Sequence, residues 1–360
     1  MSVTNALLLV ILILIFVLPL VVKKVEENLE VFLFIMGVLA TVTAGSTGEL
    51  EGGYGALVNE IFSNVYMYII VAIVLVGGFL FKALSKNMHS GVRKALEKIP
   101  IEGFVFLFTV LLGLLSSVIT AIVASLVLVE IVNVLPLNRS AKIKVNIMAC
   151  FAIGLGAVLT PVGEPLATIV IGKLAKNPAL HADFFYMIRT LGIYIIPGIL
   201  VFGLIAVWFA KKGKKDGTDS EEEKLQPETY PDIVFRALKI FLFLIALDLL
   251  GSGFKPIIDA YVMQIPSTGL YWLNMCSAIL DNATLASAEI SPHMAQGQII
   301  AILMGLLISG GMMIPGNIPN IISASKLKIK SKEWIKLGVP LGLLVMAIYF
   351  LILLPTLLAV

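Results

Sequence analysis

Long apolar runs separated by short charged stretches are the dominant pattern along the chain. Each run is about long enough to be a transmembrane helix, because roughly 20 helical residues cross the ~30 Å hydrocarbon core of a bilayer. The clearest runs, with few or no charged residues, are Ala6–Val22, Leu29–Thr43, Val65–Phe81, Leu191–Ala210, Val234–Leu250 and Leu337–Val360. The pattern therefore predicts an all-α polytopic membrane protein.

Composition supports this class. The chain is 59% hydrophobic and 14% charged, and its mean hydropathy is +1.02, which excludes an ordinary soluble domain. The first apolar run has no small-residue cleavage site after it, so we expect a retained helix rather than a signal peptide. Cys150 and Cys276 stand in apolar sequence and predict neither a disulfide framework nor a metal cluster.

The basic residues predict which loops face the cytoplasm. All 26 Lys and Arg residues except Lys173, Lys176, Arg189 and Lys255 fall in five stretches, Lys23–Lys24, Lys82–Lys98, Arg139–Lys144, Lys211–Lys239 and Lys326–Lys336. By the positive-inside rule these stretches are cytoplasmic loops. The connection Gly45–Asn64 has three glutamates and no base, and we expect it outside. The resulting topology has about eight spanning helices, with both termini outside.

Two apolar segments do not fit this topology as ordinary spans. Phe104–Val134 and Gly269–Gln296 are too long for one crossing and too short for two, and each has both ends on one predicted side. Re-entrant hairpins entering from opposite faces resolve the conflict, since irregular backbone survives at membrane depth only when protein or water surrounds it. We expect the first turn near Ser116, Ser117 and Thr120, and the second near Asp281, Asn282 and Thr284.

A helix with prolines and glycines in its middle follows each hairpin. The first is "LTPVGEPLATI", Leu159–Ile169, and the second is "MIPGNIPNII", Met313–Ile322. Proline removes a backbone donor and clashes with the preceding turn, so both helices are predicted to break into half-helices. The helix-breaking prolines are Pro161 and Pro165 in the first segment and Pro315 and Pro319 in the second, with Gly163 and Gly316 between them.

These features predict an inverted-repeat transporter with two opposed re-entrant hairpins and two broken helices. Interrupted hydrophobic segments at corresponding positions of two halves indicate a midplane binding site. We expect four parts in the chain: N-terminal helices as a scaffold in residues 1–103, a first repeat in 104–210, a charged cytoplasmic linker in 211–233 and a second, inverted repeat in 234–360.

The hairpin turns with Ser, Asn, Asp and Thr, each followed by an interrupted helix, resemble the ion transporter superfamily. That superfamily includes sodium/proton antiporters, arsenite pumps, and sodium-coupled dicarboxylate and citrate carriers. The resemblance covers about Phe104–Val207 and Val234–Val360, and is nearest to an uncharacterised prokaryotic family of short candidate cation transporters. It implies the plasma membrane of a prokaryotic cell, a bilayer as partner, and a homodimer that associates through the N-terminal helices.

The resemblance also implies two sodium sites. One maps to Ser116, Ser117 and Thr120 with Pro161–Glu164, and the other to Asp281, Asn282 and Thr284 with Gly316–Asn320. The turns read Ser117-Val118-Ile119-Thr120 and Asp281-Asn282-Ala283-Thr284, which departs from the Ser-Asn-Thr turns of the dicarboxylate branch.

The chemistry at these points favours a cation. Na⁺ prefers oxygen ligands, and the candidate ligands are Asp281, Glu164, Asn282, Thr284, Ser116, Ser117, Thr120, Thr160, Gly163, Gly316, Asn317 and Asn320. No Lys or Arg lies near the break points, and Glu164 and Asp281 make the centre acidic. An ionisable residue inside a membrane is a functional hypothesis by default. We therefore expect Na⁺ at Asp281, Asn282 and Glu164, in competition with H⁺.

The sequence thus predicts a secondary active sodium or lithium/proton antiporter that works by alternating access, with no cofactor and no nucleic-acid partner. The nearest alternative is a sodium-coupled symporter of a small anion or neutral metabolite. A channel needs no paired broken helices, and an intramembrane hydrolase lacks its sequence motifs here, so no enzyme is predicted. Two other interpretations are open. Asp281 and Asn282 can form an exposed turn, and Glu164 can act as a helix cap.

Overall fold

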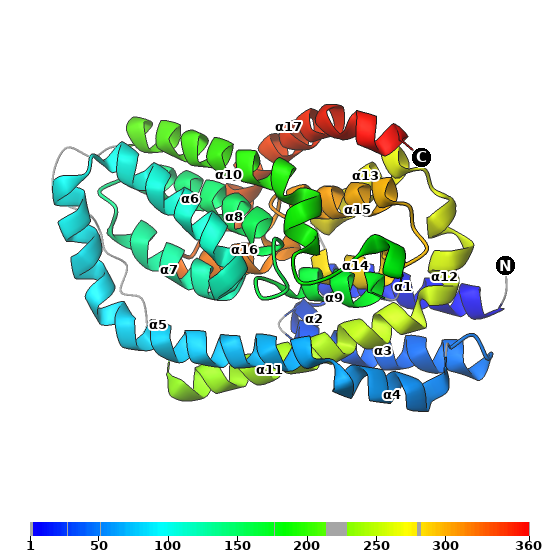
Figure 1. Ribbon diagram of the computed structural model, residues 1–360. Helices are drawn as coiled ribbons and strands as arrows, with labels where there is room; N and C mark the ends of the chain where they lie inside the picture. The colour runs from blue at the N-terminus through cyan, green and yellow to red at the C-terminus, as the bar shows by residue number, and fades with distance from the viewer. Residues whose placement is uncertain are drawn as a thin grey trace.

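The computed structural model describes residues 3–26, 28–50, 52–175, 177–213, 229–278 and 282–359. Within these ranges the structure consists of helices and connecting turns, with no strand (Figure 1). The all-α class is therefore confirmed. Asp281, Lys176 and most of the predicted linker lie outside the described residues.

Four described helices are long and apolar enough to cross a membrane: α6 (Ile101–Ile119), α8 (Arg139–Ala157), α10 (Tyr186–Lys212) and α17 (Ser331–Leu358). A fifth candidate combines α4 (Gly53–Ser63) with Met67–Val76 of α5 (Val65–Lys98), across a 42° bend. Shorter apolar stretches are Val3–Pro19, Glu30–Ser46, Ala121–Val134, Pro165–Leu174 and Gln296–Ser309. The chain is a membrane protein, and the number of eight spans stays a prediction.

A layer of helices that includes most of the N-terminal ones lies along one side of the molecule (Figure 1). In it α11 (Tyr230–Gly253) packs against α3 (Leu29–Ser46), α5 and α4. The remaining N-terminal helices are α1 (Val3–Val21) and α2 (Lys23–Glu26), and α11 is followed by α12 (Lys255–Ala260) and the 3₁₀ turn η2 (Val262–Gln264). We call α1–α5 with α11 and α12 the scaffold layer.

The other helices form two groups against this layer. The first contains α6, α7 (Ala121–Val134), α8, α9 (Pro165–Leu174) and α10, with the 3₁₀ turn η1 (Pro178–Leu180). The second contains α13 (Ser267–Leu273), η3 (Asn274–Ala278), α14 (Asn282–Glu289), α15 (Gln296–Ser309), η4 (Ile314–Gly316), α16 (Ile318–Lys326) and α17. In the view of Figure 1 the first group lies mainly to the left and the second mainly to the right. One large apolar core runs through both groups.

The segment Lys82–Lys98, which we expected to be a loop, is instead the second part of α5. Its sequence has no proline until Pro100, and Ile99 before that proline is extended, as residues before proline usually are. The expectation was wrong because charge locates a segment relative to the membrane but does not fix its backbone conformation.

Hydrogen bonds show that α6 and α7 form a hairpin beside α8. At one end of α7 the Ala121 N–H bonds the carbonyl O of Gly163, just past α8. At the other end the Lys142 ammonium, in the first turn of α8, bonds the carbonyl O of Asn133 at 2.5 Å. Hence α7 runs antiparallel to α8, whereas Gly113 late in α6 meets Gly156 late in α8.

Three of the predicted cytoplasmic loops meet at one end of the molecule. The guanidinium of Arg139 donates to the carbonyl O of Lys328 at 3.0 Å and lies 3.7 Å from the Glu333 carboxylate. The Asn138 N–H, one residue earlier, bonds the carbonyl O of Gly213 at the end of α10. This convergence of basic loops is what the positive-inside rule requires of one membrane face.

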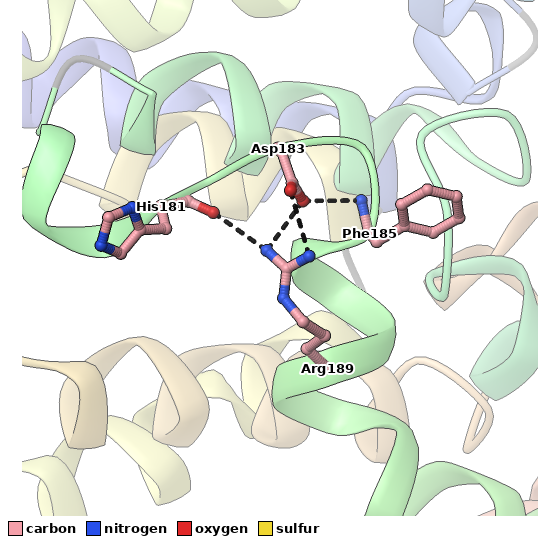
Figure 2. A network of polar contacts seen from close by, with 4 residues as sticks. All are labelled: His181, Asp183, Phe185 and Arg189. Carbon is pink, nitrogen blue, oxygen red and sulfur yellow. Dashed lines mark hydrogen bonds and ion pairs between the residues drawn. The ribbon is translucent and has the colours of Figure 1, made fainter.

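Arg189, one of the four exceptions to the charge pattern, lies in the first turn of α10 and bonds the loop that precedes this helix (Figure 2). Its guanidinium forms an ion pair with Asp183 at 2.8 Å and donates to the carbonyl O of His181 at 3.0 Å. The Phe185 N–H also donates to the Asp183 carboxylate at 2.9 Å. The Arg189 hydrogen bonds hold the pKa of Asp183 below its ordinary value.

We predict that Arg189→Met raises the pKa of Asp183 toward the value of an exposed aspartate. Because the folded-state pKa is lowered, the pair stabilises the loop above the ordinary aspartate pKa, and that contribution is lost as pH falls through the lowered value. Carbon-13 NMR of the Asp183 carboxyl in micelles measures the titration. Lys211→Met, at the other end of α10, serves as control, and an unchanged midpoint in Arg189→Met contradicts the assignment.

The close approach of α6 and α8 yields a second prediction. A Cβ on Gly156 would lie 1.7 Å from the carbonyl O of Gly113, whereas a Cβ on Gly172 would meet nothing within 4 Å. Gly156→Ala should therefore lower the free energy of unfolding by at least about 1–3 kcal/mol, and Gly172→Ala should leave it equal or slightly higher. Unfolding in detergent, followed by circular dichroism, compares the two. Equal stability of the two variants would show that the helices are not in contact there.

Candidate ion-binding site

The first hairpin turns at a single residue, Thr120, between α6 and α7. Its backbone has φ 74° and ψ 150°, a combination that non-glycine residues rarely adopt and that occurs preferentially at functional sites. The Ala121 N–H donates to the carbonyl O of Gly163 at 2.9 Å, and the Thr160 hydroxyl donates to the carbonyl O of Ser117. The turn and the break after α8 therefore form one unit.

Glu164 places a buried carboxylate in this unit. It is the N-cap residue of α9, its backbone is extended, and its exposed fraction is 5%. A carboxylate at this position interacts favourably with the positive end of the helix dipole. Pro165 follows as the first residue of α9 and Pro161 lies inside the break, as the proline pattern predicted.

A cavity of ≈20 Å³ adjoins Glu164. This volume is about that needed by one water molecule. The cavity lies between the first hairpin, the two helix breaks and the scaffold layer, and it is lined by Val74, Thr120, Ala121, Ile122, Val162, Gly163, Glu164, Pro165, Ile240, Phe243 and Ile318. It therefore sits at the boundary between the scaffold layer and the two helix groups.

Residues on either side of the second predicted turn, whose positions 279–281 lie outside the described ranges, contact the second break. The Ser277 hydroxyl bonds the side-chain O of Asn282, which is 2% exposed. Asn282 in turn lies against Gly310, where an added Cβ would be 2.5 Å from the Asn282 side-chain O. A Cβ on Gly316 would lie 2.6 Å from the carbonyl O atoms of both Gly310 and Ser277. Glycine is required at 316 because backbone approaches backbone there, and at 310 because the Asn282 side chain lies against it.

Asn320 closes the second break from inside. Its amide donates to the carbonyl O atoms of Gly310 and Met313, each at 2.8 Å, and its side chain is fully buried. The Gly310 carbonyl has lost its helical partner, and the Met313 carbonyl otherwise accepts a long bond of 3.4 Å from the Gly316 N–H. The amide therefore satisfies one acceptor that is costly to leave unpaired and strengthens the pairing of the other. Asn320 has a structural role in holding the unwound segment.

Glu164 and Asn317 are each the N-cap residue of the helix that follows a break, in the first and second helix groups. Asn317 is the N-cap residue of α16, 3% exposed, with φ −154° and ψ 147° against −155° and 157° at Glu164. Each is followed within two residues by a proline, Pro165 or Pro319, while Pro315 lies in η4. The Asn317 side chain packs on α8, where a Cβ on Gly154 would be 2.4 Å from its Nδ2. The neutral counterpart of Glu164 is thus Asn317.

The remaining predicted ligands are not all gathered at the small cavity. The Ser116 hydroxyl donates to the carbonyl O atoms of Gly113 and Ile153, and that of Ser117 donates to Leu114 in its own helix. Neither serine lines the cavity. Thr284 is buried in α14, beyond the second turn, and Asp281 falls outside the described residues. The structure therefore brings Thr120, Gly163 and Glu164 together at the small cavity. The hydroxyls of Ser116 and Ser117 instead bond backbone carbonyls of α6 and α8.

A buried polar seam between α8 and α16 was not expected from the sequence. The Asn146 amide donates to the Ser323 hydroxyl at 3.0 Å, and the Cys150 thiol lies 3.2 Å from the same hydroxyl. The spacing of Asn146, Cys150 and Gly154 by four residues places them on one face of α8, and that spacing was the available signal.

A second buried carboxylate, Glu289, accepts a hydrogen bond from the Asn274 amide at 2.7 Å. The Ser309 hydroxyl donates to the carbonyl O of the same Asn274 at 2.8 Å, which ties the second hairpin to the end of α15. We had not placed Glu289 among the candidate ligands, and its position in α14 separates it from the turn.

A larger cavity of ≈670 Å³ lies on the far side of Thr168 from the break. It separates α4 and the start of α5 from α9, α11, α12 and the segment after α14, and four charged residues line it: Glu60, Lys173, Asp248 and Lys255. The Thr168 hydroxyl, also in its wall, donates to the carbonyl O of Pro161 at 2.8 Å. We call it the outer cavity, because its helix ends lie opposite the cluster of basic loops.

One family model matches this chain, over residues 5–356, and its description is "Protein of unknown function (DUF1646)". None of the curated proteins matches the chain.

The role of Asn320 leads to a prediction. Asn320→Leu removes the buried donor of the Gly310 carbonyl, at a cost of roughly 1–3 kcal/mol, and leaves the part-buried Met313 carbonyl with only the long 3.4 Å backbone bond from Gly316. We expect a lower free energy of unfolding and faster hydrogen exchange in residues 310–317 than in the rest of the second group. Asn59→Leu, on an exposed face of α4, is the matched control. Equal exchange in 310–317 for both variants would refute the structural role of the amide.

Proposed function

From the match over nearly its whole length the chain belongs to the DUF1646 family, and we propose that it is a secondary active ion transporter exchanging Na⁺ or Li⁺ for H⁺. The observation that carries the proposal is the buried Glu164 beside the ≈20 Å³ cavity, at the junction of a hairpin turn and a helix break. A carboxylate there can hold either a proton or a cation, and competition between them is an exchange mechanism.

The composition of the cavity wall supports alternating access. Thr120, Gly163 and Glu164 come from the first helix group, Ile318 from the second, and Val74, Ile240 and Phe243 from the scaffold layer. Movement of the two groups against the scaffold layer changes which membrane face the cavity can reach. The paired breaks, with Glu164 and Asn317 as N-cap residues of the helices that follow, are the arrangement expected of an inverted repeat.

In this proposal the freed backbone carbonyls and the Thr120 hydroxyl complete the oxygen ligands around the ion, and Asp281 contributes at the second turn. The protein works as a multi-pass protein of the prokaryotic plasma membrane. The scaffold layer carries the contact between the two copies of a homodimer.

The outer cavity gives a specific reason to keep the sodium-coupled symporter as the second candidate. Its volume of ≈670 Å³ far exceeds the space that one ion needs, and Lys173 and Lys255 in its wall can bind a carboxylate. No base was expected near the centre, so this feature removes one argument against an organic solute.

Reconstitution tests the exchange. We would trap a pH dye in liposomes containing the protein and impose Na⁺, Li⁺, K⁺ and choline gradients in turn. We expect proton movement with Na⁺ or Li⁺ and none with choline, and at least a tenfold lower rate in Glu164→Gln and Asp281→Asn. Glu49→Gln, which alters an exposed carboxylate that does not line the ≈20 Å³ cavity, should match the wild type.

Two results would contradict the proposal in different ways. A silent dye for every cation, with folded and inserted protein, rules out exchange and leaves the symporter. Full Na⁺-driven proton movement in Glu164→Gln removes Glu164 from the coupling step while keeping exchange itself.

A further inference from the structure

The outer cavity has the dimensions of a binding site for an organic solute. Its volume of ≈670 Å³ falls in the range of about 300–1,000 Å³ typical of small-molecule sites. One part of its wall is apolar, formed by Leu50, Leu57, Ile61, Ile169, Ile258 and Ile290. The polar part combines two ammonium groups, two carboxylates and the hydroxyls of Thr168, Ser252 and Ser291.

The Lys173 ammonium is fixed at the cavity wall. It donates to the carbonyl O atoms of Ser287 at 2.5 Å and Ile290 at 3.2 Å, in and just past the last turn of α14. A cation is favourable at this negative end of a helix. A Cβ on Gly251 would lie 2.9 Å from the Lys173 Nζ, so α11 approaches the ammonium where it has no side chain. The charge is held in place before any solute arrives.

A carboxylate lies one helical turn from this ammonium. Asp248 precedes Gly251 by three residues on α11, so the two share a face of that helix. Lys255 follows one turn beyond Gly251, at the start of α12. The same wall therefore presents a carboxylate beside two ammonium groups. Such a mixture of charges complements a molecule that carries both charges on neighbouring atoms.

We propose that the outer cavity binds a small zwitterionic solute of the α-amino-acid class with an apolar side chain. The solute carboxylate lies toward Lys173 and Lys255, its ammonium toward Asp248, and its side chain against Ile169, Ile258 and Ile290. The Thr168 hydroxyl in the wall bonds Pro161 in the helix break, so a bound solute contacts the α9 turn that follows Glu164. This inference concerns binding and does not rest on the proposed ion exchange.

Direct binding to the purified full-length protein in detergent tests the inference. The probes are leucine, 4-methylpentanoate and 3-methylbutylamine, which share an isobutyl group and carry both charges, only the carboxylate, or only the ammonium. Isothermal titration calorimetry should show leucine binding, and at least a tenfold weaker affinity for each singly charged probe.

Variants locate the site. Lys173→Met should weaken leucine at least tenfold without weakening 3-methylbutylamine, and Asp248→Asn should weaken leucine without weakening 4-methylpentanoate. Because Lys173 also holds α14, a second variant keeps the test valid: Gly172→Leu fills the cavity from a position where a Cβ meets nothing within 4 Å, and it should abolish binding in a stable protein. Lys336→Met, exposed on α17, should bind as the wild type does.

Three outcomes would overturn the inference. If leucine does not bind at millimolar concentration to a protein with normal thermal unfolding, the charged groups pair with one another and do not form a solute site. Equal affinity for leucine and 4-methylpentanoate indicates an anion site instead. Unchanged leucine binding in Gly172→Leu places the solute elsewhere. None of these results bears on proton exchange in liposomes, so the two proposals fail separately.

Discussion

Backbone groups freed where a helix breaks inside a membrane must find partners within the protein, and this requirement governs the architecture. Lipid offers no hydrogen bonds, and each unsatisfied group costs several kcal/mol. The first break obtains its partners from a hairpin turn, through the Ala121 N–H on Gly163 and the Thr160 hydroxyl on Ser117. The second obtains them from the Asn320 amide, while its Gly316 packs closely on the backbone of Ser277 and Ala278. The first break is thus hydrogen-bonded to a hairpin turn, and the second is hydrogen-bonded mainly within its own segment.

The same constraint concentrates polar chemistry at one depth. Once unwound backbone, hairpin turns and N-cap residues are drawn together, a buried carboxylate such as Glu164 costs less there than elsewhere in the apolar core, because a helix N-terminus favours its charge. The second group repeats the backbone geometry but carries the neutral Asn317. The two N-cap positions therefore have similar backbone geometry and differ in charge.

The sequence predicted the membrane class, interruptions at both proline pairs and a turn near Ser116, Ser117 and Thr120, because these follow from local patterns: apolar length, proline pairs and polar residues in an apolar run. It did not predict that Ser116 would bond α8, or that Lys173 would enter the outer cavity. Those placements depend on residues far away in the chain, such as Ile153 and Ser287. The helical course of Lys82–Lys98 was missed for a different reason, because its charges were read as loop signals. The pairing of Glu164 with Asn317 needed backbone dihedral angles that no residue pattern encodes.

The hydrogen bonds from Lys173 in α9 to the end of α14 also have a consequence for biosynthesis. Its acceptors, Ser287 and Ile290, follow it by 114 and 117 residues, so the ribosome completes α9 long before α14 exists. During that interval a lysine at the end of a ten-residue half-helix has no helix terminus to neutralise it, and α9 is too short to cross the bilayer as an independent span. The contact between α9 and α14 therefore forms only after residues 287–290 have been made, so α9 reaches its final packing late in synthesis.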